Sequence, residues 1–202
     1  EGPFLKGVVF MVKTPKSKGL SKNRPTIGFL INELGGNYHF PEWKGVHDLA
    51  CERGANLLCF VGRRIHSADP LESPGNVIYN FVGPEIVDGL VIAGTLTVED
   101  GDRNFFNRYY SVPKVSIALQ IEGTPCVSIN NEQGFRDLLV HLIQDHGFRR
   151  LAYIGGSEDN SDARQRNQVF RKVLAEYGID FNPELVTTGR FNHKKSGNEA
   201  VK

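Results

Sequence analysis

The sequence has no apolar run that approaches the ~20 residues needed to cross a lipid bilayer. The run GVVFMV at 7–12 is too short for a signal peptide and is not followed by a small-residue cleavage site. The formal net charge is only +1 over 202 residues, so the charge balance gives no general argument for binding nucleic acid or a membrane. These absences favour a soluble globular protein.

Cysteine is also scarce, and the three residues Cys51, Cys59 and Cys126 are odd in number. They form no CxxC motif, and no pair of histidines sits at metal-ligand spacing in the sequence, so we expect no metal site. Reduced thiols that fill small apolar spaces fit this usage best. Reduced thiols are typical of a cytoplasmic protein.

The sequence lacks the common signatures of catalysis and of nucleotide cofactors. It has no GxSxG, no Walker loop and no GxGxxG after a strand, and no nucleophile–base pair is visible. We therefore expect no cofactor and no enzyme activity. An enzyme of Rossmann or flavodoxin type stays as the less favoured alternative.

What the chain does contain is a clear βαβ unit near its start. A strand over 26–31, TIGFLI, leads through a polar loop into an amphipathic helix over 41–53, which is followed by a second strand over 56–61, NLLCFV. Pro41 is expected in the first turn of that helix, where its missing N–H costs nothing. Parallel strands joined in this way place the loop at the carboxyl edge of the sheet, where open α/β sheets bind small ligands.

The same alternation continues along the chain. Further strands are predicted over 87–94, 112–119, 126–130, 151–156 and 185–191, and further helices over 100–110, 133–146 and 163–177. This order predicts an α/β protein built of doubly wound parallel-sheet lobes. We expect the first three strands to be neighbours in one parallel sheet, covered by the helices over 41–53 and 133–146.

Residues 1–24 differ in composition from the rest. They hold five lysines and Arg24 against a single acid, Glu1. A basic segment of this kind is typical of a solvated leader or linker, and a phosphate-contacting role is the alternative.

Two adjacent stretches carry a family resemblance. HLIQDHGFRRLAYIGG (141–156) resembles the "HLIxxGHRxIxxIxG" stretch of lactose-repressor/galactose-repressor (LacI/GalR-type) effector domains. SEDNSDARQRNQVFRKVLAEYGID (157–180) resembles the family segment that follows it, a polar loop, an arginine and a helix that ends in a glycine turn. RPTIGFLI and VDGLVIAG match strands of the family in type and spacing.

The resemblance implies a periplasmic-binding-protein-like type I fold, in which two lobes close on a small polar ligand. The first lobe is then expected over 25–148 and a partial second lobe over 149–202, with strand 151–156 in a sheet separate from strand 26–31. The chain departs from the family at two positions. Asn130 stands where the family commonly has Asp, and Val169 stands where its Arg-x-x-Gly has Gly.

Five residues are the candidate ligand contacts. Arg166 aligns with the arginine that holds the ligand in the family, and its guanidinium suits a carboxylate, a phosphate or a vicinal diol. Tyr38 and His39 lie in the predicted loop after the first strand, where Tyr38 can stack on a sugar ring. Thr95 follows strand 87–94, and Asn130 follows strand 126–130. Each candidate has a structural alternative. Arg166 can be a surface arginine in an ordinary ion pair at a helix start, Tyr38 and His39 can serve in loop capping and packing, and Thr95 can belong to a turn. Asn130 or Asn131 can cap the helix that follows them, and Ser161 and Asp162 can cap the next helix.

The expected function is that of a sensor domain in a bacterial-type transcriptional or signal-transduction regulator, which binds a sugar-like ligand between its lobes. The alternative within the family is the effector domain of a DNA-binding repressor. A homodimer is possible, and contact with DNA is expected only through a module absent from this chain.

Overall fold

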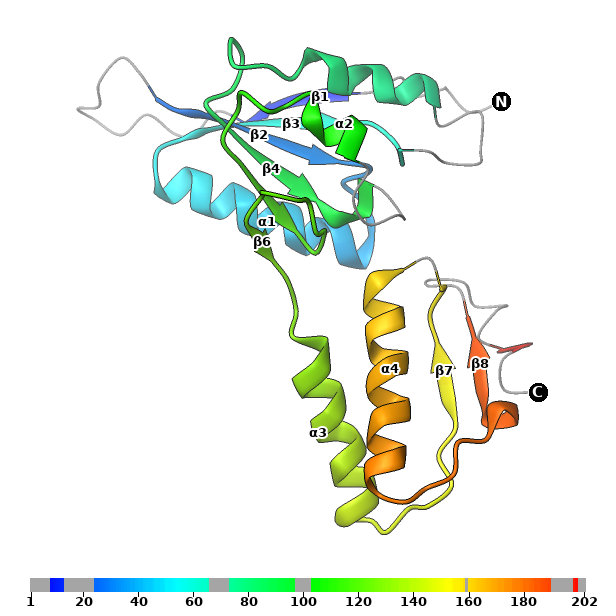
Figure 1. Ribbon diagram of the computed structural model, residues 1–202. Coiled ribbons are helices and arrows are strands. Elements are labelled where there is room, and N and C mark those ends of the chain that lie inside the picture. Colours follow the sequence, from blue (N-terminus) through cyan, green and yellow to red (C-terminus); the bar gives the residue numbers. More distant parts are fainter. Residues whose placement is uncertain are drawn as a thin grey trace. The chain divides into compact units, whose positions relative to one another are not determined.

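Two sheets, each in its own unit of the chain, organise the structure. The computed structural model describes residues 8–12, 24–65, 73–96, 103–158, 160–189 and 198–199. The chain divides into two compact units, Glu1–Ser128 and Ile129–Lys202 (Figure 1). This division falls earlier in the chain than the predicted boundary between 148 and 149.

The first unit is built on a six-stranded sheet. Its strands are β1 (Val8–Val12), β2 (Thr26–Ile31), β3 (Asn56–Val61), β4 (Gly89–Ala93), β5 (Lys114–Ile117) and β6 (Cys126–Val127), in the order β1-β3-β2-β4-β5-β6. β2 pairs in parallel with both β3 and β4, which confirms the prediction that the first three predicted strands are neighbours in one parallel sheet. The strong apolar runs of β2 and β3 are what a sheet covered on both faces requires.

The edge strand β1 was not expected in the sheet. It pairs antiparallel with β3, in a register that places Val8 opposite Val61 and Val12 opposite Leu57. Residues 8–12 therefore form sheet structure, although they lie inside the predicted linker over 1–24. Their sequence, VVFMV, is rich in the β-branched and large apolar residues that favour strands, and this local preference prevailed over the basic composition around it.

Helices cover both faces of this sheet (Figure 1). On one face, α1 (Gly36–Glu52) packs Trp43 and Val46 against a cluster that includes Phe29, Leu57 and Cys59. On the other face, the 3-10 helix η1 (Ser73–Phe81) and the short helix α2 (Arg103–Asn107) contribute to a second apolar cluster. This arrangement is the doubly wound α/β architecture predicted from the sequence.

Helix α1 starts earlier than predicted. The sequence placed its first turn at Pro41, whereas the helix begins at Gly36 and contains Pro41. The proline removes one helical hydrogen bond, to the carbonyl of Asn37, near the amino end of the helix. The longer helix therefore takes in Tyr38 and His39, which were expected in a loop.

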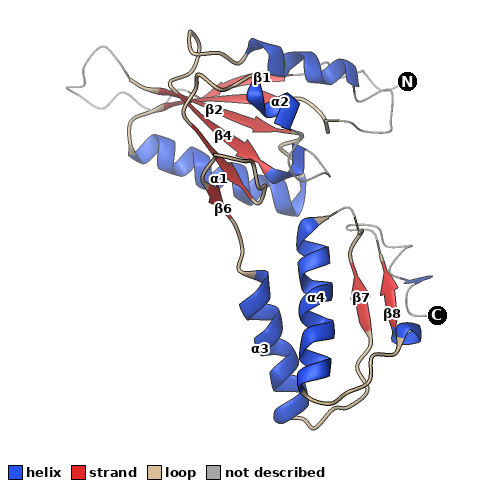
Figure 2. Cartoon of the chain, viewed as in Figure 1, coloured by secondary structure: helices blue, strands red, loops and turns tan. Residues whose placement is uncertain are grey.

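In the second unit, the described residues include the helices α3 and α4 and a small parallel sheet (Figure 2). Its elements are α3 (Asn131–Gln144), β7 (Tyr153–Gly155), α4 (Ser161–Glu176), the 3-10 helix η3 (Pro183–Leu185) and β8 (Val186–Thr188). β7 and β8 form a sheet of their own, which confirms that the strand predicted over 151–156 lies outside the first sheet.

The prediction that helix 133–146 covers the first sheet is wrong. α3 packs in the second unit, where its Leu139 and Ile143 share an apolar cluster with Phe170 and Val173 of α4. Apolar spacing shows that a helix has a buried face, but it does not name the element against which that face packs. Among the described residues, no helix combines the length and the apolar character that crossing a membrane requires.

Candidate functional site

In the first unit, the candidate residues gather at the carboxyl edge of two neighbouring strands. β2 is followed by Asn32 and Glu33, and β4 is followed by the 3-10 helix η2 (Gly94–Leu96). Because β2 and β4 are paired in parallel, with Leu30 opposite Ile92, the segments that follow them lie at the same edge of the sheet. This is the edge at which open α/β sheets bind ligands.

A close backbone approach shapes this edge at Gly94. A Cβ atom at this position would lie 2.7 Å from the carbonyl oxygens of both Ile117 and Ala118. Any side chain here would have to push the end of β5 away from the end of β4. The glycine therefore keeps Thr95, the next residue, next to the sheet.

His39 and Tyr38 lie in the first turns of α1. The His39 Nδ1 atom is 3.0 Å from a carboxylate oxygen of Glu33, and the His39 side chain is only 12% exposed. The Tyr38 side chain is half exposed and meets the His39 ring edge-on, with the ring centroids 5.7 Å apart. The contact with Glu33 fixes the orientation of the imidazole.

Several polar atoms in this region are buried and have no hydrogen-bond partner among the described residues. They are Asn32 Oδ1, His39 Nε2, Glu42 Oε2 and Thr95 Oγ1. A buried polar atom without a partner costs about 1–3 kcal/mol, and each such atom in a native protein calls for an explanation. Burial also raises the pKa of Glu42 to about 7. A polar ligand at this edge would supply the missing partners.

In the second unit, the polar groups are joined to one another. Arg166 Nε of α4 donates to Asn131 Oδ1 at 2.8 Å, and Asn131 Nδ2 donates to Asp162 Oδ1 at 2.8 Å. Asn131, the first residue of α3, is only 4% exposed. This chain of hydrogen bonds ties the beginnings of α3 and α4 together and holds the Arg166 guanidinium in place.

Of the helix caps considered in the sequence, that of α3 is confirmed and that of α4 is not. Asn130 caps α3, since its side chain accepts a hydrogen bond from the backbone N–H of Gln133 at 3.0 Å. Asn160 caps α4 in the same way, through the N–H of Ala163 at 2.9 Å, and takes the role considered for Ser161 and Asp162. Because Asn130 fills the capping position, the Asn131 side chain is left for the contacts with Arg166 and Asp162.

The five sequence candidates thus fall into two sets. Tyr38, His39 and Thr95 belong to the first unit, and Asn130 and Arg166 belong to the second. Asn32 belongs to the polar loop predicted after the first strand but was not among the five candidates, and Glu42 was not predicted. A helix start placed at residue 36 would have revealed Glu42, because it lies three residues after His39 and shares its face of the helix.

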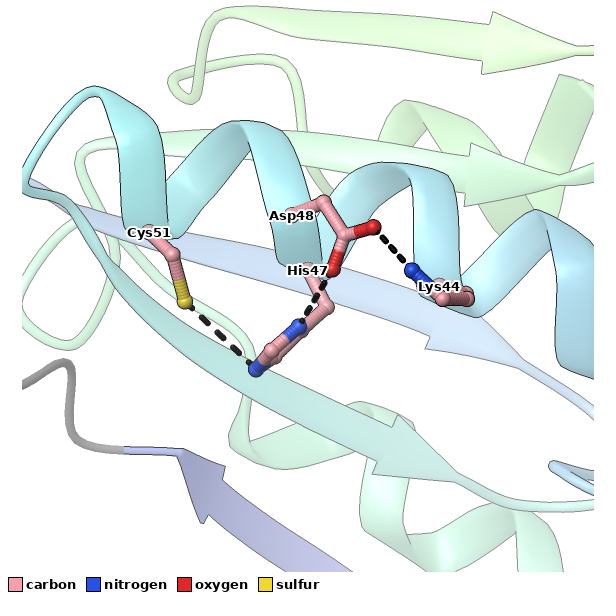
Figure 3. A network of polar contacts seen from close by, with 4 residues as sticks. All are labelled: Lys44, His47, Asp48 and Cys51. Atoms are coloured by element: carbon pink, nitrogen blue, oxygen red, sulfur yellow. Dashed lines mark hydrogen bonds and ion pairs between the residues drawn. The ribbon is translucent and has the colours of Figure 1, made fainter.

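A separate polar network lies further along α1 (Figure 3). Asp48 contacts Lys44 and lies 3.1 Å from His47 Nδ1, and the opposite ring nitrogen of His47 is 3.5 Å from the Cys51 sulfur. Hydrogen bonds from Lys44 and then His47 lower the pKa of Asp48. The His47 ring also stacks on Trp43, with centroids 5.0 Å apart. These contacts support the middle of the helix and do not extend to the polar edge near His39.

The described part of the chain holds no group of three or more His, Cys, Asp or Glu side chains placed to bind a metal ion. The polar groups of the two units instead offer amide, hydroxyl, imidazole, carboxylate and guanidinium groups. Such a set suits a ligand that is rich in hydroxyl groups.

Comparison with known proteins finds similarity to operon repressors. No protein-family model matches the chain. The chain is 28% identical over 187 residues to the sucrose operon repressor of Klebsiella pneumoniae, a match that covers 91% of this chain and 52% of that protein. It is 27% identical over 168 residues to the ribose operon repressor of Escherichia coli K12, with coverage of 82% and 48%. The chain spans about half the length of these curated relatives.

Among solved structures, a sugar-binding transcriptional regulator of the LacI family from Escherichia coli superposes with a TM-score of 0.67. The sequences are 21% identical, and the match covers 87% of this chain and 62% of that one. The homologues are LacI-type repressors. The α/β fold of this chain is accordingly the periplasmic-binding-protein-like fold of LacI-type regulators, as the sequence resemblance implied. The relatives are named as repressors rather than as enzymes.

Proposed function

We propose that this chain is the ligand-sensing domain of a bacterial-type transcriptional or signal-transduction regulator and that it binds a sugar or a related polar molecule. The observation that carries the proposal is the buried polar set of the first unit, whose atoms have no partner among the described residues. The sugar class is supported by the names of the relatives, which are repressors of sucrose and ribose operons.

Each unit, taken by itself, offers polar groups that suit such a ligand. Asn32 and Thr95 can exchange hydrogen bonds with hydroxyl groups, and the ring of Tyr38 suits the apolar face of a sugar. In the second unit, Arg166 offers donors in a fixed fork, which matches a pair of adjacent hydroxyl oxygens. We therefore propose Tyr38, His39, Thr95, Asn130 and Arg166 as ligand contacts and add Asn32.

Signalling by such a domain is a shift of populations. A ligand favours one conformation only by the difference between its affinities for the two states. The proposal includes no catalytic step, no cofactor and a cytoplasmic location, as befits a relative of transcriptional repressors. We also propose that the protein forms a homodimer. Any contact with DNA would be made by a module outside these residues.

Titration calorimetry with a panel of mono- and disaccharides and nucleosides tests the proposal on the complete protein. We expect saturable binding of at least one sugar, with a negative heat-capacity change from the apolar surface buried on binding. Thr95→Val and Arg166→Ala should each weaken that binding, whereas Arg53→Ala, at the exposed end of α1, should leave it unchanged. Failure of every sugar to bind, or equal affinity in all the variants, would contradict the proposal.

A further inference from the structure

The carboxyl end of α3 carries two histidines whose ring nitrogens converge. His141 Nε2 and His146 Nε2 are 3.0 Å apart, and the two rings lie nearly perpendicular, with centroids 4.7 Å apart. The other ring nitrogen of His141, Nδ1, lies 2.6 Å from a carboxylate oxygen of Asp145. All three side chains are exposed to solvent.

The backbone around this cluster is well held. Gly147 adopts a left-handed conformation, with φ of 69°, that ends the helix, and the N–H of Phe148 bonds back to the carbonyl of Leu142 at 3.1 Å. The His146 ring stacks on the Phe148 ring, with an interplanar angle of 16° and centroids 5.7 Å apart. The helix end therefore fixes His146, and Asp145 fixes His141.

The proton placement follows from these contacts. A carboxylate only accepts hydrogen bonds, so Asp145 selects the form of His141 that carries its proton on Nδ1. The Nε2 atom of His141 then has a free lone pair, and it points at the Nε2 atom of His146. Histidines that bind metal ions in proteins usually donate their other ring N–H to a carboxylate in this way, because the carboxylate orients the ring.

We propose that His141 and His146 bind a divalent late-transition-metal ion, such as Zn²⁺ or Ni²⁺, through their two Nε2 atoms. Imidazole nitrogen suits these metals, and solvent would complete the coordination sphere at this exposed position. The negative end of the α3 macrodipole also favours a cation here. This site lies at the opposite end of α3 from Asn131 and Arg166, so it does not rest on the proposed sugar function.

Zinc titration of the complete chain by calorimetry, in a buffer that does not chelate metals, tests the site. We expect one equivalent to bind through this pair, and His141→Gln and His146→Gln should each abolish that binding. Asp145→Asn keeps both ligands and should weaken the affinity by about 10- to 100-fold, as loss of an outer-shell partner does. Binding should also weaken as the pH falls, because protons compete with the metal for imidazole nitrogen.

His47→Gln is the matched control. His47 also has a carboxylate at its Nδ1, but its Nε2 atom faces the Cys51 thiol instead of a second histidine. Circular dichroism of each variant confirms that the fold is kept. Absence of zinc binding in the natural chain would overturn the proposal, as would zinc binding lost in His47→Gln but kept in His146→Gln. Imidazole ¹⁵N spectra that show a proton shared between His141 and His146, unchanged by zinc, would overturn it as well.

Discussion

The two units present polar side chains at comparable places in their folds but treat them in opposite ways. In the second unit, Asn131 is buried and bonded to both Arg166 and Asp162. In the first unit, polar atoms of His39 and Thr95 are equally shielded from solvent but have no partner among the described residues. The polar groups of the second unit have hydrogen-bond partners within the protein, whereas these atoms of the first unit have none among the described residues.

This difference has an energetic meaning. A satisfied buried network stabilises the fold and holds its members in one geometry, whereas unsatisfied groups cost stability until something binds them. The second unit therefore offers a preorganised guanidinium. In the first unit, the polar groups are already shielded from water in the folded protein. A ligand that forms hydrogen bonds with them would not incur that desolvation cost again.

The largest expected effect concerns Arg166. In the complete protein, Arg166→Ala should weaken sugar binding by roughly 1.5–3 kcal/mol, the scale of a lost hydrogen bond to a charged group. Calorimetry with the best sugar of the panel measures this. Arg164→Ala is the control, since Arg164 bonds to the carbonyl of Glu158 on an exposed part of α4. Equal losses in both variants would show that Arg166 has no special place at the ligand.

The next largest effect is expected from the hydrogen-bond network around Asn131. Asn131→Ala leaves Arg166 Nε and one oxygen of Asp162 without their partner, and it should lower the free energy of unfolding by about 1–3 kcal/mol. Hydrogen–deuterium exchange of the backbone amides of α3 and α4 measures this loss of stability in the second unit. Asn130→Ser, which keeps a capping side chain, should change exchange little. Unaltered exchange in Asn131→Ala would mean that the hydrogen-bond chain adds nothing to stability.

In the first unit, Glu42 should make stability depend on pH. Its pKa is raised by burial from 4.5 to about 7, so the folded state binds a proton more tightly than the unfolded state. Stability is then greatest below pH 4.5 and falls as the pH rises to about 7, by about 1–2 kcal/mol once the solvent that still reaches the group is allowed for. Trp43, the single tryptophan, reports unfolding of this unit by fluorescence. The difference between Glu42→Gln and the natural chain should change over this pH range, and a constant difference would refute the assignment.

The smallest effect is expected at Thr95. Thr95→Val replaces a buried hydroxyl that has no described partner with a methyl group of similar size, so stability without ligand should stay the same or rise by about 1 kcal/mol. Sugar binding should weaken in the same variant. The opposite signs distinguish a hydroxyl kept for a ligand from one that supports the fold. A clear loss of stability would place Thr95 in the second category.

The strands were predictable from the sequence to a large extent. β2 and β3 have the predicted bounds, because their apolar runs end sharply at polar or glycine residues. The partner of α3 was not predictable, because an apolar stripe fits any apolar surface of matching shape. β1 was missed as an element of the sheet because its five strand-forming residues stand among lysines and prolines.

The candidate site was predictable only residue by residue. Side-chain chemistry and family resemblance selected Arg166, but the bond from its Nε atom to Asn131 depends on how α3 meets α4. The buried state of Asn32 and Glu42 depends on the packing of α1, which no local pattern encodes. The convergence of His141 and His146 was likewise hidden, since a separation of five residues matches no helical repeat and arises from the turn at Gly147.

The pairing of β1 with β3 joins segments that are far apart in the sequence, since Val12 lies opposite Leu57. Closing a loop of that length costs entropy before any contact is gained, whereas the neighbouring βαβ unit closes a shorter loop. β1 also has one neighbouring strand, while β2 and β3 each have two. We therefore expect β1 to join the sheet late in folding, after β2 and β3 have formed the template on which it pairs.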